Sequence, residues 1–127
     1  MQPWEMHCTD IQRVGSRETC NPPPLDTDED WLLLVNIEEY PAFHAAVVEQ
    51  YEQTSQEGYQ AEDGTISPFT CFRFEDKNLI VTTNKGFFDR FMQANRIAKN
   101  LNLLDKSDRI ALFQRILYNA SPTINSA

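Results

Sequence analysis

The chain has 127 residues, a formal net charge of −8 at pH 7 and an ordinary apolar fraction of 41%. We expect residues 1–120 to form a single domain and residues 121–127 a flexible tail. No apolar run is long enough to span a membrane, and an acidic chain is a poor nonspecific ligand for duplex DNA. Three cysteines without a CxxC spacing argue against a disulfide framework or structural zinc, so we expect a cytoplasmic protein.

Charge is unevenly distributed along the chain. Residues 1–84 hold 16 acidic and four basic side chains, whereas residues 85–127 hold seven basic and three acidic ones. An acidic part beside a basic part suits a site where carboxylates that hold a metal face a phosphate-binding surface. Solvated helices would give the same distribution, so both interpretations stay open.

The first half of the chain contains one clear strand signal. Residues 9–14 suit either a short helix or a strand, and residues 15–30 are rich in loop-forming residues. The continuous apolar run at residues 31–35 is typical of a strand buried on both faces. Residues 37–56 are predicted to form a helix, with Pro41 in its first turn.

The second half predicts a hairpin followed by two helices. Residues 69–74 and 78–83 are rich in β-formers and flank a short turn, which indicates an antiparallel pair. A helix over residues 86–101 precedes another that Asp105 can cap. The expected fold is α/β (α+β), a small mixed sheet with helices packed on it.

The candidate chemistry lies before the apolar run. Asp28 and Asp30 are two residues apart at the start of a strand and therefore point to the same side. Neighbouring carboxylates repel, and Mg²⁺, which takes one or two carboxylates plus substrate phosphates, would neutralise them. Gly15 and Ser16 can offer N–H groups and a hydroxyl to phosphate oxygens, and Arg17 adds a guanidinium. The same acids would also suit a solvated loop.

This order of residues resembles the nucleotidyltransferase superfamily typified by DNA polymerase beta, in its minimal phage or bacterial form. The residues that carry the resemblance are Val14, Gly15 and Ser16, then Asp28, Glu29 and Asp30, then the apolar residues 31–35. The resemblance implies the minimal nucleotidyltransferase fold over residues 12–84. It also implies that Mg²⁺ binds Asp28 and Asp30, while Gly15 and Ser16 position the phosphates of a nucleoside triphosphate.

Members of that family that use two metals usually carry a third acid at the start of the strand after the hairpin turn. The resemblance places Asn78 there, so the implied catalytic residues are Asp28, Asp30 and Asn78. Asparagine can give a carbonyl oxygen to a metal, but it cannot accept a proton as a base. Asp76 would take this place if the register differed by two residues.

Two classes of function follow from the resemblance. An enzyme would transfer a nucleoside monophosphate to a hydroxyl of a protein, an RNA end or a small molecule, with Arg17 helping to hold the phosphates. An inactive relative would be a protein-binding module that inhibits a host factor or acts like an antitoxin, and Asn78 and the acidic residues 1–84 favour this alternative. Exposed hairpin strands would also permit a homodimer.

Overall fold

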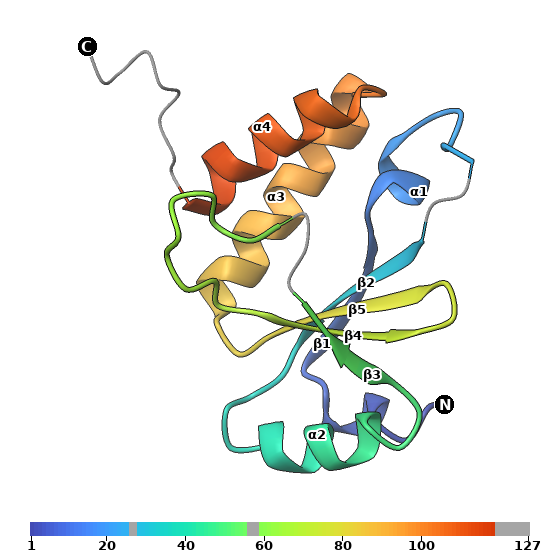
Figure 1. Ribbon diagram of the computed structural model, residues 1–127, viewed down its shortest axis with the longest axis vertical. Coiled ribbons are helices and arrows are strands. Elements are labelled where there is room, and N and C mark those ends of the chain that lie inside the picture. The colour runs from blue at the N-terminus through green and yellow to red at the C-terminus, as the bar shows by residue number, and fades with distance from the viewer. Residues whose placement is uncertain (26–27, 56–58, 119–127) are drawn as a thin grey trace.

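The computed structural model describes residues 1–25, 28–55 and 59–118, which form a five-stranded sheet with helices on both faces (Figure 1). The predicted tail, residues 121–127, lies outside this part of the chain. The strands are β1 (Asp10–Val14), β2 (Glu29–Leu34), β3 (Glu52–Thr54), β4 (Thr70–Phe74) and β5 (Lys77–Thr82). The helices are the 3-10 helix η1 (Glu5–His7), α1 (Ser16–Thr19), α2 (Tyr40–Val47), α3 (Lys85–Leu101) and α4 (Lys106–Tyr118).

The sheet is mixed, as the sequence predicts. Its strand order is β1-β2-β5-β4-β3, with β2 and β5 parallel and all other neighbouring pairs antiparallel. The register places Asp30 of β2 between Val14 of β1 and Asn78 of β5. The amino-terminal end of β2 therefore lies beside both the end of β1 and the start of β5.

Two hydrophobic cores lie on opposite faces of the sheet. α3 and α4 cover the face to which Leu32 and Leu34 of β2 point, whereas α2 covers the face of Leu33 and Val35 (Figure 1). Successive side chains of a strand alternate between faces, so the continuous apolar run of β2 contributes to both cores. By the same alternation Asp30 belongs to the face that α3 and α4 cover.

Several predicted elements are confirmed. Residues 10–14 form a strand rather than a helix, and the hairpin forms as β4 and β5 with Glu75 at a positive φ of 55° in the turn. α3 forms as an amphipathic helix with its aromatic face buried. Asp105 caps α4 by accepting a hydrogen bond from the Ser107 N–H at 2.9 Å.

The long helix predicted over residues 37–56 is wrong. α2 ends at Val47, and residues 52–54 form the short edge strand β3 against β4. Tyr51 turns inward instead, where its ring packs against Trp4 and Phe74. Burial of this aromatic ring ends the helix, and pairing with a distant strand then fixes the backbone of β3. The loop predicted over residues 15–30 also contains the short helix α1 and the first residues of β2.

Candidate functional site

Gly15 and Asp30 are packed against each other where β1 meets α1. Gly15 has a φ of +88°, and a Cβ added to it would overlap Oδ2 of Asp30 and stand 3.0 Å from its Cβ and Cγ. The Gly15 N–H donates to Oδ1 of Asn95 on α3 at 3.1 Å, which fixes the turn. A glycine is required here because the backbone conformation is left-handed and no space remains for a side chain.

Asp28 and Asp30 open onto one cavity of about 300 Å³ between β2, α1 and α4. Its lining combines glycine, hydroxyl and amide groups with basic and aromatic groups. The other lining residues are Gly15, Ser16, Thr19, Tyr59, Asn95, Lys106, Arg109, Ile110 and Phe113. The structure thus brings together four of the residues singled out in the sequence, namely Gly15, Ser16, Asp28 and Asp30.

The basic side of the cavity comes from α4. Nη1 of Arg109 donates to the carbonyl oxygens of Leu103 and Leu104 at 2.9 and 2.7 Å, so its position is fixed. Lys106 makes no ion pair among the residues that the structure describes. The uneven charge of the sequence is thus expressed locally, because two basic residues of the second half face two acids of the first.

Burial dominates the electrostatics of Asp30. Burial of the carboxyl group away from water raises the pKa of Asp30 from 3.8 to about 6, and the nearby charge of Asp28 acts in the same direction. Nδ2 of Asn78 donates to Oδ1 of Asp30 at 3.2 Å, which lowers the pKa and only partly offsets the burial. Asp30 is therefore a carboxyl group that gains or loses its proton near neutral pH.

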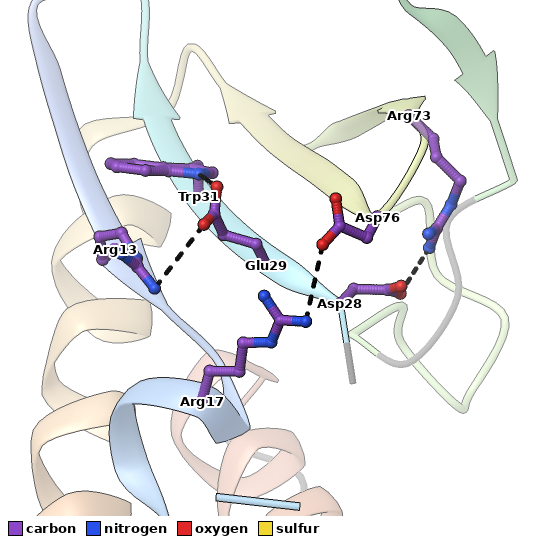
Figure 2. A network of polar contacts seen from close by, with 7 residues as sticks. All are labelled: Arg13, Arg17, Asp28, Glu29, Trp31, Arg73 and Asp76. Carbon is purple, nitrogen blue, oxygen red and sulfur yellow. Dashed lines mark hydrogen bonds and ion pairs between the residues drawn. The ribbon is translucent and has the colours of Figure 1, made fainter. Parts of the chain in front are cut away.

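Asp28 is ionised through a contact with Arg73 of β4. Nη2 of Arg73 donates to Oδ2 of Asp28 at 2.7 Å, and Figure 2 shows the guanidinium reaching the carboxylate from the side of β4. This hydrogen bond is the main cause of a lowered pKa at Asp28. The two carboxylates thus differ in their surroundings, since one is neutralised by a cation and the other is buried beside an amide.

Arg17 contacts Asp76 and does not line the cavity. Its Nη2 lies 3.6 Å from Oδ2 of Asp76, and it is not among the cavity-lining residues (Figure 2). Asp76 lies in the β4–β5 turn, where its carbonyl oxygen accepts the N–H of Glu29. The register places Asn78, not Asp76, beside Asp30, as the sequence interpretation assumed.

Sequence reasoning missed polar residues that reach the site from distant elements. They are Arg73 of β4, Asn95 of α3, Arg109 of α4 and Tyr59 of the segment between β3 and β4. Charge distribution was the only signal for Arg109. The positions of the other three depend on how distant elements pack, which no local pattern encodes.

The oxygen-rich side of the cavity fits a hard divalent cation that obtains further ligands from a phosphorylated compound. Asp28 and Asp30 supply two carboxylates, and Ser16 and Thr19 supply hydroxyls. Mg²⁺ typically uses one or two carboxylates together with phosphate oxygens and water. Within residues 1–25, 28–55 and 59–118, no group of three or more His, Cys, Asp and Glu side chains could hold a metal by itself.

No known family model and no curated protein matches this chain in sequence. Its fold is similar to that in the crystal structure of conserved protein GrpB from Enterococcus faecalis. The TM-score is 0.56 with 17% sequence identity, and the match covers 93% of this chain and 83% of that chain.

No helix in the described part of the chain is long and apolar enough to cross a membrane.

This likeness corrects the family expected from the sequence. The match is to GrpB and not to a nucleotidyltransferase, so assignment to the nucleotidyltransferase superfamily, in a minimal phage or bacterial form, is wrong. Gly-Ser and Asp-x-Asp are short and common motifs, and here Gly15 and Ser16 lie between β1 and α1, whereas Asp28, Glu29 and Asp30 lead into β2. The chain has a GrpB-like α/β fold with a five-stranded mixed sheet and helices.

Proposed function

We propose that the cavity binds a nucleoside triphosphate together with Mg²⁺, and that the protein transfers the nucleoside monophosphate to a hydroxyl acceptor. One observation carries the proposal: Asp28 and Asp30 line the same cavity as Lys106 and Arg109. A polyphosphate with a bound divalent cation needs carboxylates for the cation and basic groups for the remaining phosphate charge. This combination on one cavity is what supports a metal–nucleotide ligand over a free anion.

Each wall of the cavity has a role in this proposal. Asp28 and Asp30 would hold Mg²⁺, which supplies charge stabilisation at the phosphates. Gly15 and Ser16 allow a phosphate group to approach the backbone closely. The aromatic ring of Tyr59, packed against Phe113 with centroids 5.4 Å apart, offers an apolar wall to a base or sugar.

In the transfer, the acceptor oxygen forms a bond to the α-phosphorus. The bond from the α-phosphorus to the oxygen that bridges it to the β-phosphate breaks, so pyrophosphate leaves and the hydroxyl proton passes to water. Asp28 and Asp30 would hold Mg²⁺, and Asn78 beside Asp30 cannot accept that proton, so the residues of this chain act by orientation and charge. Lys106 and Arg109 would stabilise the negative charge that develops on the leaving pyrophosphate.

A second candidate is a binding protein without catalysis. Its specific support is that both carboxylates already have protein partners, Arg73 at Asp28 and Asn78 at Asp30. In that role the cavity would bind a ligand, or a partner protein would be bound elsewhere on the acidic surface, without any transfer. The two candidates differ in turnover, which a labelled nucleotide measures directly.

Calorimetry with each of the four nucleoside triphosphates, with and without Mg²⁺, tests the binding. We expect binding that requires Mg²⁺ and disappears in Asp28→Asn/Asp30→Asn. The matched control is Glu38→Gln/Asp89→Asn, which removes the same charge from exposed positions outside the cavity. Absence of binding by folded wild-type protein would refute the proposal.

An α-phosphate-labelled nucleotide, incubated with the protein and candidate acceptors, then separates enzyme from binding protein. Label that moves to an acceptor in wild type, but not in Asp28→Asn/Asp30→Asn, supports transfer. Metal-dependent binding without any labelled product, across protein, RNA and small-molecule acceptors, favours the binding protein. A pull-down with wild-type protein and the double variant would then identify a protein partner.

A further inference from the structure

The ion pair between Arg73 and Asp28 lies between two cavities. Asp28 lines the cavity described above, and Arg73 lines a second one of about 250 Å³ together with Thr54, Ser55, Cys71 and Asn78. The guanidinium contacts Asp28 at 2.7 Å, and the side chains of Arg73 and Asp28 are 40% and 42% exposed. Arg73 therefore has open space beside it and is held at Asp28 chiefly by charge.

A free divalent cation would meet competition at this carboxylate. Binding to Asp28 would require the cation either to displace the guanidinium or to approach it closely, and like charges a few ångströms apart repel. A polyphosphate changes this balance, because it brings several negative charges. Its oxygens can accept hydrogen bonds from Arg73 while the cation takes the carboxylate.

We propose that Arg73 is a specificity-determining residue that makes binding of the divalent cation depend on a phosphorylated ligand. Arg73 occupies Asp28 when no ligand is bound and contacts a phosphate when the metal complex enters. Metal and polyphosphate then bind with positive coupling, each raising the affinity of the other by the same factor. This inference rests on the function proposed above, because it assumes that Asp28 holds the cation.

The test compares Mn²⁺ alone with the Mn²⁺ complex of inorganic tripolyphosphate, in wild type and Arg73→Gln. Electron paramagnetic resonance reports free Mn²⁺, and calorimetry reports the complex. We expect Arg73→Gln to bind Mn²⁺ alone about tenfold more tightly and the complex about tenfold more weakly, a coupling within the usual range. Opposite changes distinguish release of Asp28 from general damage, which would weaken both.

Arg13→Gln is the matched control. Arg13 carries the same charge, but its guanidinium lies over the Trp31 ring, with Cζ 5.2 Å from the centroid, and near Glu29 (Figure 2). We expect this variant to change either affinity by less than about twofold. Addition of Asp28→Asn to Arg73→Gln should abolish the gain for free Mn²⁺.

Three results would overturn the inference: no gain for free Mn²⁺ in folded Arg73→Gln, a gain that persists after Asp28→Asn, or an equal gain in Arg13→Gln. The half-exposed ion pair contributes little to folding, so Arg73→Gln should fold, and circular dichroism checks this. The two proposals can fail separately. If wild-type protein binds the complex through Asp28 and Asp30 but Arg73→Gln shows no gain in affinity for free Mn²⁺, the inference is wrong and the proposed function still holds. If the wild-type protein binds neither Mn²⁺ nor its tripolyphosphate complex, both this inference and the proposed function are refuted.

Discussion

At the scale of single residues, Asp30 is a carboxyl group that the folded protein holds in its protonated form up to a pH of about 6. The unfolded chain releases this proton near the ordinary pKa of 3.8. Because the folded state binds the proton more tightly, this residue lowers stability progressively as the pH rises from about 4 to about 6. Above that window the whole penalty is present, so the ionised group destabilises the fold at pH 7.

We expect Asp30→Asn to raise the free energy of unfolding at pH 7 by about 3 kcal/mol, since each unit of pKa shift corresponds to about 1.4 kcal/mol. The amide oxygen can still accept the hydrogen bond from Asn78. Urea denaturation at about pH 4 and pH 7 measures the effect, which should nearly vanish at the lower pH. A variant that is no more stable than wild type at pH 7 would contradict the assignment.

Asp28→Asn is the natural comparison, because the pKa of Asp28 in the wild-type protein is shifted in the opposite direction to that of Asp30. Arg73 lowers the pKa of Asp28, so this carboxylate stabilises the fold at neutral pH and that contribution is lost as the pH falls through its folded pKa. The ion pair is half-exposed. We therefore expect Asp28→Asn to reduce the free energy of unfolding at pH 7, by less than about 1 kcal/mol.

Substitution of Gly15 measures how tightly the turn is packed against Asp30. We expect Gly15→Ala to lower the free energy of unfolding by about 3 kcal/mol, because it combines a strained backbone with overlap at Asp30. Gly64→Ala is the matched control, since Gly64 has a φ of +85° and no atom within 4 Å of the added Cβ. The control should cost only about 1 kcal/mol. If thermal denaturation shows the same loss of stability in Gly15→Ala and Gly64→Ala, the side chain of Asp30 moves to make room for the added methyl group.

At the scale of elements, α3 supports the site through one buried amide. Asn95 is 7% exposed and accepts the Gly15 N–H. We expect Asn95→Ala to cost about 2 kcal/mol of stability and to weaken metal–nucleotide binding, because the turn loses its only described side-chain acceptor. Gln93→Ala, at an exposed position of the same helix, should change neither. Unchanged nucleotide binding by Asn95→Ala, measured by calorimetry, would show that the turn keeps its position without α3.

Elements with a strong local pattern could be predicted, and those fixed by distant contacts could not. The apolar run of β2 and the amphipathic face of α3 each follow from burial of their own residues. β3 has the polar sequence Glu-Gln-Thr, and only pairing with β4 makes it a strand. The candidate site divides in the same way. Asp28 and Asp30 follow from alternation along one strand, whereas Arg73 reaches Asp28 from β4, 45 residues away in sequence.

At the scale of the whole molecule, the cavity is a place where acids of residues 1–84 meet basic residues of residues 85–127. The acids at the start of β2 face the first turns of α4, and the sheet with its two cores holds these elements in place. A net charge of −8 disfavours an anionic ligand at long range, so a nucleotide needs both the basic side of the cavity and a cation to bind. This balance makes binding sensitive to the protonation of Asp30.

The binding of Mn²⁺ should therefore depend on pH. Protons compete with the cation for Asp30, whose pKa is about 6, so we expect the affinity to level off above pH 6 and to fall about tenfold per pH unit below it. Mn²⁺ alone is the suitable probe, because the phosphates of a nucleotide titrate in the same range. Electron paramagnetic resonance titrations at half-unit intervals between about pH 5 and pH 8 would measure this profile. Asp30→Asn should bind more weakly with a flat profile over that range, whereas an unchanged profile in the variant would place the cation away from Asp30.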